Sequence, residues 1–111
     1  NYDDENCIIS ASVEAPVTQC VRVIPGSHYL YSIVARSAKK KVRARKHIKW
    51  LDKDGKFIAT DMQVFYCSQT WVAETMEVVA PSNAAEAIVY VSGHSSIPVE
   101  FKGCSLKERI V

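Results

Sequence analysis

The clearest pattern of apolar and polar positions lies between Ser27 and Asp54, where a lysine-rich turn joins two alternating segments. The first, residues 29–35, is rich in aromatic and β-branched residues, which favour strands. The second, residues 42–50, alternates with the two-residue period of a strand. Its apolar face consists of Val42, Ala44, Ile48 and Trp50, and its opposite face of Arg43, Arg45, His47 and Lys49. We expect the apolar face to pack in a core and the basic face to meet water or a ligand.

Lys46 interrupts this alternation, because it falls among the apolar positions of the second segment. The interruption predicts a sheet edge or a β-bulge at this point. In the first segment Tyr29, Tyr31 and Ile33 share one face, and we expect both tyrosines to fill the core.

Further short strands are expected along the chain, separated by turn residues. Pro25-Gly26 and Asp54-Gly55 are the strongest turn signals. The expected strands cover residues 7–13, 19–24, 56–59, 63–67, 71–79, 87–91 and 99–106. About eight or nine short strands, with no convincing helix, predict an all-β fold, an antiparallel β-sandwich.

The length of 111 residues suits one domain with a two-layer core. Residues 1–6 are acidic and polar without periodicity, and we expect a flexible arm or a strand that a partner orders. Residues 7–111 would then form a single β-sandwich domain. The sequence begins with Asn1 rather than Met, which favours a processed or trimmed chain.

Charge and hydropathy exclude two classes of partner. The net charge of +2 is too small to indicate nucleic acid, and the only strong cluster is five Lys and Arg residues between Lys39 and Arg45. No apolar run approaches the length that crosses a bilayer, so membrane insertion is not expected.

The four cysteines are Cys7, Cys20, Cys67 and Cys104. Their spacing contains no Cys-x-x-Cys motif, so neither zinc nor another cofactor is implied. Scattered cysteines in even number favour two disulfides and an oxidising location, on a secreted protein or at a cell or virion surface. Free thiols in a cytosolic protein are the alternative. Of the three possible pairings we favour Cys7 with Cys104, which leaves Cys20 with Cys67.

Several motifs follow one another in a recognisable order. They are Gln19-x-Val21-x-Val23-x-Pro25-Gly26-x-x-Tyr29, the segment 48–55 ending in Asp52-Lys53-Asp54-Gly55, Thr70-Trp71 followed by Ala80-Pro81, and the strands 87–91 and 99–106. In this order they resemble the jelly-roll carbohydrate-binding modules of the superfamily that holds families four, nine and twenty-two. The resemblance covers about residues 7–106 and implies a jelly-roll sandwich that binds glycans without catalysis.

Two departures from this family concern the termini. Its members usually begin with a longer segment that carries Asn-x-x-Phe-Glu, packs as a strand and helps to bind a structural calcium. Here only residues 1–6 stand in its place, and the last strand reads Phe101-Lys102-Gly103-Cys104 without the usual aspartate pair. The resemblance is therefore to an N-terminally shortened module. Both halves of the calcium site lack the residues that the family usually has there.

Aromatic side chains are the first candidates for a glycan site, because their faces stack on sugar rings. Trp50 and Trp71 stand where the family pattern places core tryptophans, so core packing competes with ligand binding for both. Tyr90 faces outward if the alternate residues of 87–91 fill the core. Tyr66 is ambiguous because Phe65 lies beside it. Of these, Tyr90, Tyr66 and Trp71 are the candidates for a ligand platform.

The basic face is the second candidate. Arg43, Arg45, His47 and Lys49 alternate along one strand, with side chains about 7 Å apart, and Arg36 is a candidate neighbour. Such a row can grip the carboxylates or sulfates of an acidic polysaccharide, or an acidic patch on a neighbouring subunit. The alternative is a solvated face that prevents edge-to-edge aggregation.

Catalysis finds little support in the sequence. No Gly-x-Ser-x-Gly motif is present, and the three histidines have no recognisable nucleophile partner. We therefore expect a non-catalytic extracellular module that binds a glycan, acidic or neutral. The alternative is a structural subunit of an extracellular filament or virus particle. Its homo-oligomer or filament neighbours would assemble by sandwich packing or by adding a strand to the groove that a missing first strand leaves open.

Overall fold

The computed structural model describes residues 8–12 and 16–109, which form eight strands and, among the residues described, no helix. The described part of the chain thus has no helix long and apolar enough to cross a membrane. The strands are β1 (Ile9–Ala11), β2 (Val17–Arg22), β3 (His28–Ser37), β4 (Val42–Leu51), β5 (Phe57–Cys67), β6 (Val72–Val79), β7 (Glu86–Gly93) and β8 (Val99–Arg109).

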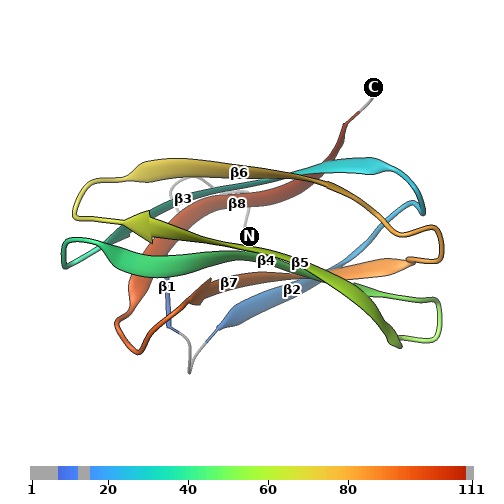
Figure 1. Ribbon diagram of the computed structural model, residues 1–111, viewed down its shortest axis with the longest axis horizontal. Helices are drawn as coiled ribbons and strands as arrows, with labels where there is room; N and C mark the ends of the chain where they lie inside the picture. The colour runs from blue at the N-terminus through green and yellow to red at the C-terminus, as the bar shows by residue number, and fades with distance from the viewer. Residues whose placement is uncertain (1–7, 13–15, 110–111) are drawn as a thin grey trace.

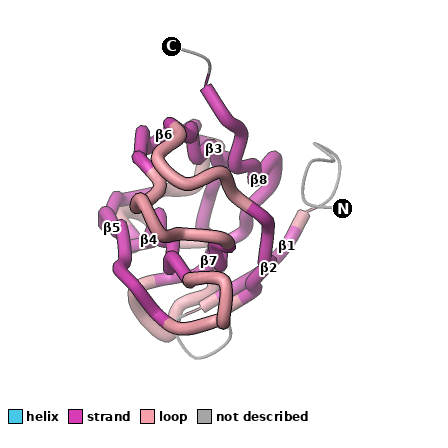
Figure 2. The backbone as a smooth tube through the Cα atoms, turned by 90° about the vertical axis from the view of Figure 1, so that its right-hand side faces the viewer, coloured by secondary structure: helices cyan, strands magenta, loops and turns pink. Residues whose placement is uncertain are grey.

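These strands build two antiparallel sheets packed as two layers (Figures 1 and 2). Sheet A has the order β1-β8-β3-β6 and sheet B the order β2-β7-β4-β5. Consecutive strands mostly alternate between the sheets, and this order is that of an eight-stranded jelly roll. The prediction of an all-β antiparallel sandwich of jelly-roll type is therefore confirmed.

The two sheets share one core, which the alternating strands fill from both sides. Trp50, Tyr31 and Phe101 are fully buried, and Tyr29 is nearly so. The polar ends of Trp50 and Tyr31 find hydrogen-bond partners, as burial of such groups requires. Trp50 Nε1 donates to Asp61 Oδ2 at 2.7 Å, and the Tyr31 hydroxyl crosses the core to donate to the Tyr90 carbonyl at 2.9 Å. The core positions expected for Trp50, Tyr29 and Tyr31 are confirmed.

The predicted strands 56–59 and 63–67 are one continuous strand, β5. The sequence pattern fails here because it is inverted: Asp61 and Gln63 fall on the side that faces sheet A, while Met62 and Val64 are exposed on the other side. Asp61 is accommodated by the Trp50 indole, so a polar residue on the inner side is satisfied. Alternation alone reads such a stretch as a break.

Lys46 causes neither an edge nor a bulge, so that expectation is wrong. β4 is an inner strand, and Lys46 keeps regular register with Gln63 on β5 and Val91 on β7. The irregularity of the β4–β5 pair lies instead at Trp50/Leu51. Lys46 points into the sandwich and is 6% exposed. Its ammonium donates to Glu74 Oε1 on β6 at 2.8 Å and to the Thr75 carbonyl at 3.1 Å, which links the two sheets.

The expected Cys20–Cys67 disulfide is not formed. Cys20 is exposed on β2 and Cys67 is buried on β5, and both are free thiols. These strands are the two edges of sheet B, about 14 Å apart at three strand spacings, well beyond the reach of a disulfide. Cys104 is buried on β8, but Cys7 lies outside the described residues, so their pairing stays a prediction.

Strand β1 covers only part of the edge of β8 in sheet A. β1 pairs with β8 through Ile9↔Phe101, Ser10↔Glu100 and Ala11↔Val99. β8 continues to Arg109, and beyond Phe101 no described strand pairs with this edge. The arm of residues 1–6, whether flexible or strand-donating, lies outside the described residues.

The Lys46–Glu74 pair allows a test of how the sheets are held together. We expect Glu74→Gln to lower the free energy of unfolding by about 2–4 kcal/mol, because it leaves a buried ammonium without its counter-charge. Replacing both residues, as Lys46→Met with Glu74→Leu, should restore most of that loss, since no buried charge remains. Urea unfolding of the three proteins measures this. A Glu74→Gln variant as stable as the parent would contradict it.

Candidate functional site

The face of sheet B that points away from sheet A, here called the outer face of sheet B, gathers most of the candidate residues. Its centre is a cross-strand pair, His47 on β4 opposite Tyr90 on β7. Their rings stack with centroids 4.6 Å apart and planes 20° from parallel. Tyr90 points outward because Ala87, Val89 and Val91 are buried, as the alternation predicts. A flat, partly exposed ring surface thus lies in the middle of a sheet.

Hydrogen bonds determine the tautomer of His47. The Thr60 hydroxyl donates its proton to the Ile48 carbonyl at 2.8 Å, and its oxygen lies 2.9 Å from His47 Nε2. Since the hydroxyl proton is already used, Nε2 must carry the hydrogen that Thr60 accepts. Nδ1 is then the unprotonated nitrogen, and it is buried without a hydrogen-bond partner in the described residues.

The surroundings of His47 favour the neutral ring. Burial lowers the pKa of His47 below its ordinary value of 6.5, and the charges of Arg45 and Lys49 on the same strand lower it further. A proton added at Nδ1 would have no acceptor and would lie between two cations. At neutral pH the His47 ring in the stack is therefore uncharged.

Cations surround the stacked pair on the same face. The Lys49 ammonium lies 5.3 Å from the centroid of the Tyr90 ring. Arg45 is anchored through Nε, which donates to the Gly93 carbonyl at 3.2 Å. Arg43 Nε donates to the Tyr66 hydroxyl at 3.3 Å. The predicted residues Arg43, Arg45, His47, Lys49, Tyr66 and Tyr90 therefore share one surface, on which two tyrosines lie to either side of a row of cations.

Sequence reasoning found Tyr66 but missed the rest of the part of this face that β5 contributes. Met62 is 46% exposed, Val64 41% and Tyr66 50%, so an apolar strip runs beside the cations. Thr60 at its end holds His47. The alternation of Met62, Val64 and Tyr66 was present in the sequence, but it was hidden because the inward positions Asp61 and Gln63 are polar. Within the described residues, no group of three His, Cys, Asp or Glu side chains gathers as a metal site.

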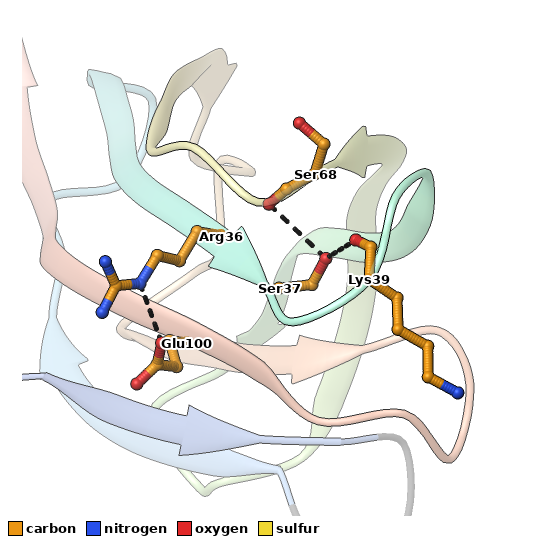
Figure 3. Close-up of polar contacts among 5 residues, drawn as sticks. All are labelled: Arg36, Ser37, Lys39, Ser68 and Glu100. Atoms are coloured by element: carbon orange, nitrogen blue, oxygen red, sulfur yellow. Dashed lines mark hydrogen bonds and ion pairs between the residues drawn. The ribbon is translucent and has the colours of Figure 1, made fainter.

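Trp71 and Arg36 lie elsewhere. Trp71 is only partly exposed and belongs neither to the core nor to the outer face of sheet B. Its ring is held by the Arg36 guanidinium at 4.3 Å and the Lys102 ammonium at 4.4 Å from the centroid, both from sheet A. Arg36 also pairs with Glu100 at 2.8 Å (Figure 3). Its expected place beside the basic row is wrong, because β3 belongs to the other sheet.

Sequence comparison finds no protein family and no curated protein that matches this chain. Comparison of structures does find matches. A family 4 carbohydrate-binding module matches with a TM-score of 0.65 at 15% identity, over 85% of this chain and 61% of that one. A family 22 module, described as a xylan-binding domain, matches with a TM-score of 0.62 at 18% identity, over 85% of this chain and 67% of that one. The resemblance in fold to these modules is confirmed.

A third match comes from a virus. The enzymatically active domain of tailspike protein 4 of bacteriophage CBA120 matches 98% of this chain with a TM-score of 0.69 at 18% identity. This chain spans only 17% of that protein, so the match is to one part of a much larger chain. At these identities the likeness establishes the fold alone.

The lowered pKa of His47 predicts an effect of pH on stability. Because the unfolded chain takes up the proton at a higher pH than the folded one, His47 contributes its stability in full above about pH 6.5. That contribution should be lost as the pH falls from there through the lower pKa of the folded state. Urea unfolding at several pH values, beside a His47→Gln control, measures this. An equal fall in both proteins would assign the effect to other groups.

Proposed function

We propose that this protein is a non-catalytic glycan-binding module that takes a polysaccharide along the outer face of sheet B, with a preference for acidic chains. The observation that carries the proposal is the His47–Tyr90 stack set between cations and an exposed apolar strip. The same fold in carbohydrate-binding modules of families 4 and 22 supports it. We place its site of action outside the cell, on a secreted protein or at a cell or virion surface.

The aromatic groups would supply the stacking surface. Tyr90 on β7 and Tyr66 on β5 are separated by strand β4 and by about four positions along the sheet, which puts them about 16 Å apart. A chain of several sugar units can reach from one to the other. The Tyr31 hydroxyl fixes the backbone at Tyr90, and the stack on His47 holds the Tyr90 ring, so little order has to be acquired on binding.

The cations would supply orientation and selectivity. Arg43 and Arg45 lie on the path from Tyr66 to Tyr90, and Lys49 lies just beyond Tyr90, where an acidic chain would place its carboxylates or sulfates. Charge-assisted hydrogen bonds to such groups are stronger than those to neutral hydroxyls. Their exposed setting also makes the attraction sensitive to salt.

The small number of carboxylates on this face fits binding without cleavage. Among the strand residues described there, Glu86 is the one carboxylate, and it lies at the end of β7 against the Cys20 thiol. Hydrolysis of glycosidic bonds generally uses a pair of carboxyl groups on either side of the bond. His47 Nε2 is engaged by Thr60, and its Nδ1 is buried. The face has groups that grip a chain and lacks a pair that would cut it.

A structural role in a larger assembly is the second candidate. It is favoured by the match of 98% of this chain to part of a phage tailspike protein and by the edge of β8 beyond Phe101, which no described strand covers. An arm such as residues 1–6 of another subunit could add a strand at that edge.

Affinity electrophoresis in gels with neutral or acidic polysaccharides tests the leading proposal. We expect Tyr90→Ala to weaken retention roughly tenfold or more for every polysaccharide that binds, since a central aromatic contact is lost. Arg43→Ala with Arg45→Ala should weaken retention by acidic chains much more than by neutral ones. The matched control is Lys53→Ala with Lys56→Ala, which removes two charges from the turn between β4 and β5, away from Arg43 and Arg45. A parent protein that no polysaccharide retains would sink the proposal.

Light scattering distinguishes the second candidate. A glycan-binding module should elute as a monomer at all concentrations tested, whereas a subunit that assembles should give ordered oligomers. If residues 1–6 donate a strand, their deletion should return the oligomers to monomers without lowering the stability of the monomer. Oligomers that persist after the deletion would exclude strand addition by that arm.

A further inference from the structure

A cavity lies at the end of the sandwich, where the β3–β4 turn meets the β5–β6 loop. Its volume is about 690 Å³, within the range of about 300–1,000 Å³ typical of small-ligand sites. The cavity is lined by Lys40, Lys41, Tyr66, Cys67, Ser68, Gln69, Thr70, Trp71 and Val72. Only Tyr66 belongs also to the outer face of sheet B.

The two loops that form the cavity are tied together by hydrogen bonds. The Ser37 backbone N–H donates to the Ser68 carbonyl at 2.8 Å. The Ser37 hydroxyl lies between the Lys39 and Ser68 carbonyls (Figure 3). Gln69 Nε2 donates to the Ala38 carbonyl at 3.1 Å. These bonds join two loops that each cross from one sheet to the other, so the cavity exists before any ligand arrives.

Lys41 has an unusual backbone at the rim of this cavity. Its φ is +56°, the left-handed region that glycine or asparagine normally occupies in turns. The Lys41 ammonium lies 5.5 Å from the centroid of the Tyr66 ring. A long cationic side chain is thus present where glycine would be less strained, and it reaches the cavity wall.

The aromatic walls differ in what they offer. Tyr66 is half exposed, with the cations of Lys41 and Arg43 near its ring. Trp71 is held by Arg36 and Lys102 and is therefore a rigid wall rather than a free stacking face. A ring-shaped ligand would stack on Tyr66 and abut Trp71.

Polar groups between these walls are available to a ligand. The hydroxyls of Ser68 and Thr70 make no hydrogen bond with the described residues, and Gln69 uses its amide nitrogen but not its Oε1. Lys40 and Lys41 add two ammonium groups at the rim, and the only titratable group among the other lining residues besides Tyr66 is the Cys67 thiol. Rings, hydroxyl partners and cations together suit a sugar that carries a negative charge.

We infer that this cavity is a second binding site, which takes one or two anionic sugar units with the ring on Tyr66 and the carboxylate or sulfate at Lys41. The ligand class rests on the proposed glycan function, but the site uses a different set of residues. Because Tyr66 belongs to both surfaces, an acidic chain lying on the outer face of sheet B could place its end in the cavity.

Backbone amide shifts in NMR titrations test this inference. The probes are digalacturonic acid for a carboxylate source, a sulfated heparin disaccharide for a sulfate source, and neutral cellobiose. We expect at least one acidic probe to shift residues 39–41 and 66–72, and cellobiose to do so only weakly. Lys41→Gly should weaken that binding by roughly fivefold or more while the fold becomes no less stable, because glycine suits the positive φ. Lys53→Gly is the matched control and should leave the affinity unchanged.

The outcomes separate this inference from the proposed function. Shifts confined to residues 45–49 and 88–92, or an unchanged affinity in Lys41→Gly, would overturn the cavity site and leave the outer face of sheet B standing. Shifts at the cavity from a protein that no polysaccharide retains would support the cavity site and overturn the outer face. Absence of shifts with all three probes would overturn the cavity site whatever the polysaccharides do. An equal loss in Lys53→Gly would show general charge attraction and overturn it as well.

Discussion

The two-residue period of strand β4 is the constraint on which the rest of the structure depends. β4 is paired on both sides, so its backbone cannot turn to relieve a conflict between its faces. Trp50 and Ile48 are therefore buried on one side, while His47 and Lys49 are held on the other. The order that stabilises the core is the same order that aligns the cations and sets His47 against Tyr90.

Lys46 shows how strictly this constraint acts. A shift of one residue would have exposed Lys46 but would also have buried the basic row, and the strand keeps its register instead. The cost of an ammonium inside the sandwich is offset by Glu74 and a backbone carbonyl from the opposite sheet. Close by, the Trp50 indole and Asp61 satisfy each other. The inner side of β5 and β6 therefore tolerates polar groups that elsewhere would disrupt the core.

Two concave or exposed surfaces with related chemistry meet at Tyr66. One is an extended sheet face with stacked rings, cations and an apolar strip, and the other is a cavity between two tied loops. Under the function and the inference proposed above, the sheet face would take a length of polysaccharide, and the cavity a short segment or an end of it. Similarity to carbohydrate-binding modules and to part of a tailspike protein concerns the scaffold.

Alternation along the chain was enough to predict the all-β sandwich, the burial of Trp50 and the outward position of Tyr90, because the pleat of a strand is a local property. The row from Arg43 to Lys49 followed from the same rule. Only the tertiary structure decided which residues come together. It placed Glu74 beside Lys46 and the Arg36 guanidinium over Trp71, kept Cys20 apart from Cys67, and brought the two loops together around Lys41. These depend on strand order, which brings together residues far apart in sequence and which no local pattern encodes.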